Sequence, residues 1–416
     1  MRLPSLISAF LLPCVSLWAQ TSPPPDAVAR RGMPNFLSRC AQDGQSLRVA
    51  YFGGSITAAN GWRVQTLQEF RKRWPKAQFA EINAAIGGTG SDLGVFRCDH
   101  DVVSQKPDLV FVEFAVNDGG ADPARIEKGM EGIVRQIWSA LPSCDICFVY
   151  TIAGNMLDDY KAGRVPRSVQ TMERVADHYA IPSINFGPEI ARREAAGQLI
   201  FKAPGTSQDG KPVFSNDGVH PHPDTGHVVY TDLVRKAVEE WSAKPAASPA
   251  KLGEPLRPDH WQAARTVEVK ETWLKGGWRK LDAATDNLAK SFSSRLPVLF
   301  EASEAGATLE FAFDGTMIGV FDLLGPDGGQ VRVRIDGQDK GLRPRFDSYC
   351  TYQRLASLWL AEDLPPGRHT VRLELTAEPI DKAAILAKRN EKIDDPARFA
   401  PLRWHPGSIL VVGQLE

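Results

Sequence analysis

A carboxylate and a histidine stand three residues apart near residue 220, and side chains of these two types can act together on a proton. The segment reads Asp217-Gly218-Val219-His220-Pro221. In a loop, this spacing lets the aspartate accept a hydrogen bond from one ring nitrogen while the other nitrogen faces outward as a general base. The pair therefore indicates proton transfer to or from a nucleophile elsewhere in the chain.

The same segment also has a competing interpretation as a metal site, because His222, Asp224 and His227 follow closely. A His-x-His pair is a spacing found among zinc ligands. The prolines at 221 and 223, and the helix expected to begin nearby, make three converging histidines unfavourable. We therefore expect no metal, with His222 and His227 solvated or supporting the base.

A serine suited to be the nucleophile lies in residues 52–57, which read FGGSIT. The two glycines before Ser55 permit a tight turn that would present its hydroxyl at the end of a strand. The pattern is not the G-x-S-x-G elbow of α/β-hydrolases, because Thr57 replaces the last glycine. An ordinary glycine turn with a helix-capping serine would look the same, so this segment alone does not decide the chemistry.

Two further loops carry donors that could stabilise an oxyanion. Residues 83–91 (NAAIGGTGS) form a glycine loop before an expected helix, and the backbone N–H groups of such a loop suit a developing negative charge. The loop lacks the Gly-Lys-Ser/Thr ending of a phosphate-binding P-loop. Residues 116–120 (VNDGG) place the Asn117 amide after another strand, although such a run is also common turn chemistry.

These segments follow the strands of a predicted α/β domain. Strands are predicted at 47–52, 79–82, 109–116, 146–152 and 183–186, and helices at 62–74, 126–141, 165–179 and 225–241. Glu113 is the one charged residue of the apolar run 109–116. The alternation predicts a parallel sheet with helices on both faces. In such a sheet, active residues gather at the carboxyl ends of the strands.

Together the four segments resemble the SGNH/GDSL hydrolase family. They occur in the family's order over residues 45–242, and the Gly-Gly-Ser-Ile-Thr first block is similar to that of secreted carbohydrate esterases. The resemblance implies the family's fold, a flavodoxin-like three-layer α/β domain with a parallel sheet. It also implies a catalytic triad with Ser55 as nucleophile, His220 as base and Asp217 as the residue that orients the base.

The resemblance also implies an oxyanion hole. Its donors would be the Ser55 N–H, the Gly88 N–H and the Asn117 side-chain amide. Gly88 matches the family best by its spacing from Asn83, and Gly87 or Gly90 could take its place.

The sequence departs from the family at two positions. Gly54 stands where the first block usually has Asp, and Ala115 where the third block usually has Gly. The first change removes a carboxylate that supports the loop in many members. Trp62 and Arg97, which follow the first and second blocks, are predicted to line the substrate pocket. An arginine there would suit a carboxylated sugar such as a uronic acid, although a surface salt bridge is the commoner role. We expect no cofactor.

The rest of the chain predicts a second domain. Residues 243–260 begin with AKPAASPAKLGEPLRP and are rich in Pro, Ala and Lys, as is typical of a linker. Beyond them, Asp-Gly turns at 314–315, 327–328 and 336–337 separate short alternating runs, which predicts a β-sandwich over residues 261–416. Its tryptophans could stack on sugar rings, although core packing is their commoner role: Trp273, Trp278, Trp359 and Trp404.

The N-terminus is typical of an exported protein. Arg2 precedes an apolar run, and Ala19 offers a cleavage site, so residues 1–19 are predicted to be a Sec-type signal peptide and residues 20–44 an N-terminal extension. The run is shorter than the roughly 20 residues of a membrane-spanning helix, and the proline before Cys14 fits a lipoprotein signal badly. We expect a secreted or periplasmic protein with no membrane span in the mature chain.

Five cysteines follow the predicted signal peptide, an odd number for an oxidising compartment. Cys144 and Cys147 form a C-x-x-C pair that enters an apolar run, where a redox motif would open a helix. A local disulfide or plain buried thiols are the alternatives.

The expected partner is an acylated carbohydrate, because export and an attached β domain favour a polysaccharide substrate. The net charge is -1 without a polybasic stretch, so we expect neither nucleic acid nor an anionic membrane surface as a partner. The family resemblance then implies hydrolysis of acyl esters, above all O-acetyl esters, on a polysaccharide or oligosaccharide through an acyl-Ser55 intermediate. The alternatives are a glycan acyltransferase and a non-catalytic glycan-binding protein on the same fold. The sequence does not indicate the oligomeric state.

Overall fold

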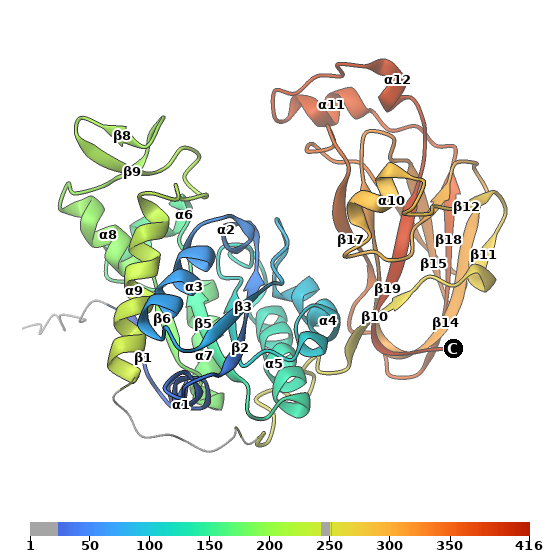
Figure 1. The fold of residues 1–416 in the computed structure, drawn as a ribbon. Coiled ribbons are helices and arrows are strands. Elements are labelled where there is room, and N and C mark those ends of the chain that lie inside the picture. The colour runs from blue at the N-terminus through green and yellow to red at the C-terminus, as the bar shows by residue number, and fades with distance from the viewer. Residues whose placement is uncertain (1–23, 243–249, 251) are drawn as a thin grey trace, which may run out of the picture.

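The computed structural model describes residues 24–242, 250 and 252–416 (Figure 1). The predicted signal peptide at 1–19 lies outside the described residues, as do the first part of the predicted extension and linker residues 243–249 and 251. An α/β domain is followed along the chain by an antiparallel β domain.

The α/β domain is built on a six-stranded sheet with the order β1-β6-β5-β4-β2-β3. Five strands are parallel: β2 (Ser46–Gly53), β3 (Gln78–Asn83), β4 (Leu109–Glu113), β5 (Asp145–Tyr150) and β6 (Ser183–Asn185). From the β3 edge they run 2-1-3-4-5 in chain order, which confirms the predicted flavodoxin-like topology. The short β1 (Ala27–Val28) adds an antiparallel edge beside β6, which the sequence pattern did not indicate.

Helices cover both faces of this sheet because its central strands are apolar on both sides; every residue of β4 and β5 is buried. On one face, α5 packs between α4 and α7, and on the other α3 packs against α9. The helices are α1 (Pro34–Cys40), α2 (Ser55–Ala58), α3 (Trp62–Arg73), α4 (Ser91–Asp101), α5 (Pro123–Ala140), α6 (Gly154–Lys161), α7 (Arg167–Tyr179), α8 (Gly187–Ala195) and α9 (Gly226–Trp241), with a 3₁₀ turn at Val103–Gln105.

A small three-stranded sheet precedes α9 and was not predicted. It consists of β7 (Ile200–Lys202), β8 (Ser207–Gln208) and β9 (Lys211–Ser215), in the order β7-β9-β8. These strands are too short to show a recognisable alternation of apolar and polar residues in the sequence. Their importance is positional, because β9 leads directly into the segment that carries Asp217 and His220.

The β domain confirms the predicted all-β architecture, with strands that pair antiparallel. The 17-residue β14 (Thr308–Leu324) organises it. Its first half pairs with β18 and its second half with β17, while β19 runs along its other edge. The other strands are β10 (Ala264–Glu268), β11 (Leu274–Lys275), β12 (Trp278–Lys280), β13 (Phe300–Ala302), β15 (Gln330–Ile335), β16 (Gln338–Pro344), β17 (Arg354–Ala361), β18 (Arg368–Thr376) and β19 (His405–Leu415). Short helices are α10 (Asn287–Phe292), α11 (Lys382–Ala387), α12 (Pro396–Phe399) and the 3₁₀ turn Glu271–Trp273.

One apolar core extends across both domains, beside two further cores within the β domain. Phe96 of α4 packs on Trp359 of β17 with ring centroids 5.3 Å apart, and on Trp261 at 6.3 Å. The same cluster of buried residues includes Leu296 and Leu410 of the β domain. Burial of apolar surface therefore holds the β domain against α4.

The tryptophans of the β domain do not present exposed rings on which a sugar could stack. Trp404 is fully buried, Trp273 is buried, and Trp359 packs in the interface with the α/β domain. Trp278 is half-buried and donates its indole N–H to the carbonyls of Lys275 and Thr308. Core packing is the role the structure gives them, and the large exposed aromatics of the described chain are Tyr349 and Tyr352 instead.

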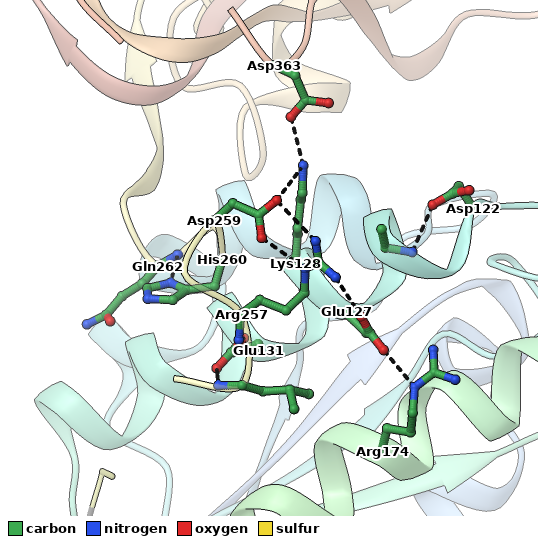
Figure 2. A network of polar contacts seen from close by, with 12 residues as sticks. Asp122, Glu127, Lys128, Glu131, Arg174, Arg257, Asp259, His260, Gln262 and Asp363 are labelled. Carbon is green, nitrogen blue, oxygen red and sulfur yellow. Dashed lines mark hydrogen bonds and ion pairs between the residues drawn. The ribbon is translucent and has the colours of Figure 1, made fainter. Parts of the chain in front are cut away.

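The described part of the predicted linker is docked on α5 (Figure 2). The backbone N–H groups of Leu256 and Arg257 donate to the buried Glu131 carboxylate at 2.6 and 2.9 Å. Lys128 bridges Asp259 at 3.1 Å and Asp363 of the β domain at 2.7 Å. This segment is therefore a fixed strap along α5.

All five cysteines in the described part of the chain are free and buried, so Cys144 and Cys147 form no local disulfide. Burial raises the pKa of every one of these thiols, which keeps them protonated and unreactive. Within the described ranges, no helix is both long and apolar enough to cross a membrane.

Candidate active site

The serine, histidine and aspartate singled out from the sequence lie in one chain of hydrogen bonds. Ser55 Oγ lies 2.8 Å from His220 Nε2, although the two residues are 165 positions apart. His220 Nδ1 lies 2.6 Å from Asp217 Oδ2. The ring thus stands between the hydroxyl and the carboxylate, in position to take the hydroxyl proton while the carboxylate stabilises its charged form.

Hydrogen bonds within the loop after β9 hold the Asp217 carboxylate in place for its contact with the His220 ring. Ser215 Oγ donates to Asp217 Oδ1 at 2.8 Å, and the N–H groups of Val219 and His220 donate to the same oxygen, each at 2.8 Å. Gly218 turns the chain with a φ of +82°, which a residue with a side chain rarely adopts. Partial burial raises the pKa of Asp217, but the hydrogen bonds from His220, Val219 and Ser215 outweigh it and leave the pKa below its ordinary value. The carboxylate is therefore ionised.

The site is open to solvent. The side chains of His220 and Asp217 are 50% and 53% exposed, and Ser55 is half-buried at the first position of α2. As the first residue of a helix, Ser55 presents a backbone N–H with no acceptor within the helix. A substrate can therefore reach the hydroxyl, the ring and this N–H together.

The loops after β3 and β4 reach the same end of the sheet. A Cβ at Gly87 would lie 3.6 Å from Ser55 Cβ, so the glycine loop passes beside the serine. Gly88 is exposed with a φ of +73°, while Gly90 lies against the carboxylate of Asp118. Asn117 lies so close to Gly54 that any side chain at position 54 would collide with its amide. The glycine that replaces the family's Asp thus lets the asparagine lie directly against the serine turn.

The sequence pattern of the GDSL-like Lipase/Acylhydrolase family matches residues 51–227. This segment belongs to that family. The match spans the strands, loops and helix that carry the serine, the glycine loop, the asparagine and the Asp–His pair.

Two solved structures resemble the whole chain, including the β domain. One is a two-domain esterase (CEX) active on acetylated mannans, with 20% sequence identity and a TM-score of 0.73 over 94% of this chain and 99% of that chain. The other is the esterase CEX co-crystallised with mannopentaose, with 19% identity and a TM-score of 0.69 over 89% of this chain and 92% of that chain. At these identities the likeness concerns the fold. A comparison with curated proteins found no match.

A buried carboxylate that the sequence analysis left unassigned supports the serine turn of the GDSL-like domain. Glu113, at the end of β4, is fully buried and accepts hydrogen bonds from the hydroxyls of Thr57 at 2.8 Å and Thr151 at 2.7 Å, and from the Gly54 N–H. Burial raises its pKa, and these hydrogen bonds oppose the rise. The carboxylate missing from position 54 is thus supplied by the neighbouring strand. The sequence feature that could have indicated this role is the single charge of Glu113 in the otherwise apolar run 109–116.

Asp118, next to Asn117, joins the third block of the GDSL-like domain to the start of α4. Its carboxylate accepts from the Ser91 N–H at 3.0 Å. Burial, together with the neighbouring charges of Asp92 and Glu113, raises its pKa to about 7, against the lowering effect of the Ser91 hydrogen bonds.

Trp62 and Arg97 correct the prediction that they line the pocket, because both side chains are buried. Trp62 packs against Tyr51, Phe111 and Phe186 with ring centroids 5.3 to 5.9 Å apart. The Arg97 guanidinium is bound to Asp101 at 2.8 Å and to backbone carbonyls. Their positions in the sequence, just after two motifs, did not reveal which way the side chains point.

His222 and His227 do not converge with His220. His222 lies 3.1 Å from the Asn216 side chain, and His227 is buried and accepts the Trp62 N–H on Nδ1 at 3.1 Å. Burial lowers the pKa of His227 to about 4. His227 therefore supports the contact between α9 and α3, which corrects the prediction that it is solvated or supports the base. In the part of the chain that the structure describes, no group of three or more His, Cys, Asp or Glu side chains is placed to hold a metal ion.

Proposed function

We propose that this protein is a secreted serine esterase that removes O-acetyl groups from a polysaccharide or oligosaccharide. The observation that carries the proposal is the hydrogen-bonded chain of Ser55, His220 and Asp217 inside a domain of an acylhydrolase family. The two-domain fold shared with an esterase described as active on acetylated mannans supports the substrate class. Acetylated mannan is therefore the first polysaccharide to test.

The first half of the reaction transfers the acyl group to the enzyme. Ser55 Oγ attacks the ester carbonyl carbon while His220 Nε2 takes the hydroxyl proton and Asp217 stabilises the imidazolium. The carbonyl oxygen becomes an oxyanion, which accepts hydrogen bonds from the Ser55 N–H, the Gly88 N–H and the Asn117 amide. The tetrahedral intermediate then breaks its bond to the sugar oxygen, which receives the proton from His220.

The second half releases the acid. A water molecule gives a proton to His220 Nε2 and attacks the acyl carbon, and the same donors stabilise the second oxyanion. The bond to Ser55 Oγ breaks, the serine regains its proton from His220, and acetate leaves. The half-exposed histidine gives water direct access to the acyl group.

The test is acetate release from acetylated mannan, acetylated xylan and 4-nitrophenyl acetate by the wild type, Ser55→Ala and Ser104→Ala. Ser104 is an exposed serine in the 3₁₀ turn after α4 and is the matched control. We expect Ser55→Ala to lose at least about 10³-fold in kcat, with Ser104→Ala unchanged. Equal activity of Ser55→Ala and wild type would overturn the proposal. Product that forms only when an added sugar accepts the acyl group would identify acyl transfer instead.

A further inference from the structure

We propose that the β domain is a positioning part of the active site, acting through Arg295 on the loop that carries Gly88. The inference rests on the proposed function, because it assigns that loop an oxyanion donor. It gives the second domain a role in the chemical step that is separate from any contact with the substrate.

Arg295 reaches from the β domain to the start of the glycine loop. It lies just after α10, and its Nη2 donates to the Asn83 carbonyl at 3.0 Å. Its Nη1 is 2.9 Å from Asp101 at the end of α4. Asn83 is the last residue of β3, and the chain runs from it into the loop of residues 83–90. The Arg295 guanidinium of the β domain thus binds the Asn83 carbonyl, where the glycine loop of the α/β domain begins.

The second contact of Arg295 continues into the serine turn. Asp101 Oδ2 binds Arg97 Nη1 at 2.8 Å, and Arg97 donates to the carbonyls of Ala84 and Gly53, the latter at 3.3 Å. Gly53 lies two residues before Ser55, and its carbonyl also accepts the Ile86 N–H at 3.0 Å. One guanidinium therefore joins the serine turn to the glycine loop.

Arg97 and Asp101 form the buried part of this chain of contacts, while Arg295 is 22% exposed and meets the Asn83 carbonyl near the surface. Asp101 and Arg97 are each about 4% exposed or less in their side chains. Burial raises the pKa of Asp101, but the hydrogen bond from His100 and the charges of Arg97 and Arg295 lower it to about 2. Charged hydrogen bonds in such an environment are stronger and more rigid than those in water. The Asp101 carboxylate is thus held by three residues, His100, Arg97 and Arg295.

Helix α4 is fixed between the loop and the β domain. It begins directly after Gly90, at the end of the glycine loop, and it carries Arg97 and Asp101. Away from the loop, Phe96 packs on Trp359, and its carbonyl accepts the Thr266 hydroxyl at 2.7 Å. Since a shift of about 1 Å in a donor can reduce the rate about 10²-fold, an anchor on each side of α4 matters for a donor on the adjoining loop.

A matched control is available because a second ion pair joins the two domains without a residue of this loop. Lys128 of α5 binds Asp363 of the β domain at 2.7 Å, next to the docked strap (Figure 2). This ion pair involves no residue of the loop 83–90. Asp363→Asn therefore weakens the domain contact without touching the proposed anchor.

The experiment compares Arg295→Gln, Arg295→Lys, Asp363→Asn and Ser55→Ala in the full chain. One measurement is kcat and KM for 4-nitrophenyl acetate, which carries no sugar for the β domain to bind. The other is hydrogen–deuterium exchange of peptides covering residues 83–90. We expect Arg295→Gln to lower kcat about 10- to 100-fold with KM within about twofold, and to speed exchange in this loop. Arg295→Lys should recover part of kcat, and Asp363→Asn should change neither.

Three results would overturn the positioning role: unchanged exchange of residues 83–90 in Arg295→Gln, a kcat loss no larger than that of Asp363→Asn, or an effect confined to KM. The exchange measurement stands without any activity, so it tests Arg295 even on an inactive protein. Ser55→Ala that is as active as the wild type would overturn the proposed function instead.

Discussion

Gly54 and Glu113 together hold the serine turn, with the carboxylate coming from the neighbouring strand. Glu113 accepts the Gly54 N–H and two threonine hydroxyls from within the core. Position 54 is left without a side chain, and Asn117 fills the space. The serine turn is therefore held by a carboxylate of β4, while position 54 itself carries none.

This geometry predicts that Gly54→Ala disables the protein through Asn117. The φ of Gly54 is −91°, which alanine adopts without strain, so the collision with the Asn117 amide is the main effect. We expect kcat to fall about 10²- to 10³-fold, as when an oxyanion donor is lost.

A double-mutant cycle checks the cause. If Gly54→Ala acts by displacing Asn117, the double variant with Asn117→Ala loses little more than Asn117→Ala alone. Additive losses in kcat would mean that Gly54 matters for another reason.

At the scale of elements, residue types and strand ends were enough to predict where the site lies. The strand predicted at 47–52 is found as β2, whereas the one predicted at 109–116 ends already at Glu113, so that Asn117 lies in the turn that follows β4. The directions of single side chains were not predictable. Trp62 lies on the first turn of α3 and Arg97 on α4, and only the packing of these helices shows that both face inward. The role of Glu113 depends on Thr151, which is distant in sequence.

The contact between α9 and α3 predicts a pH dependence of stability. His227 is buried, and its folded pKa of about 4 lies below the ordinary value of 6.5. Between these values the unfolded chain binds a proton that the folded chain does not, so stability is full above pH 6.5 and falls as the pH drops towards 4.

The measurement is the free energy of unfolding in urea at pH 4 to 7, for the wild type and His227→Asn. Asparagine keeps an acceptor for the Trp62 N–H but does not titrate. We expect the wild type to lose about 2–3 kcal/mol more than the variant over this range. Parallel pH profiles would show that His227 is not the titrating group.

At the scale of the whole molecule, the shared core makes the two domains one stability unit. Phe96, Trp261 and Trp359 meet where α4 contacts the β domain. Arg125 lies over the rings of Trp261 and Trp359, 5.3 and 5.2 Å from their centroids. An interface built in this way resembles a domain interior more than a contact between independent modules.

We therefore expect a single unfolding transition for the wild type in calorimetry. Trp359→Ala should lower the free energy of unfolding by about 2–4 kcal/mol, because it removes a large ring from the interface, and should begin to separate the transition into two. Two separate transitions in the wild type, with the first unaffected by Trp359→Ala, would show that the domains are stable independently.

The proposed reaction depends on the transfer of the acyl group to Ser55. The most direct measurement is peptide mass spectrometry after rapid acid quench of the protein with 4-nitrophenyl acetate, in the wild type and in Ser55→Ala. We expect an acetyl group on Ser55 in the wild type and none on this peptide in the variant. An acetyl group at another residue that forms at the rate of turnover, or turnover that persists in Ser55→Ala, would contradict it.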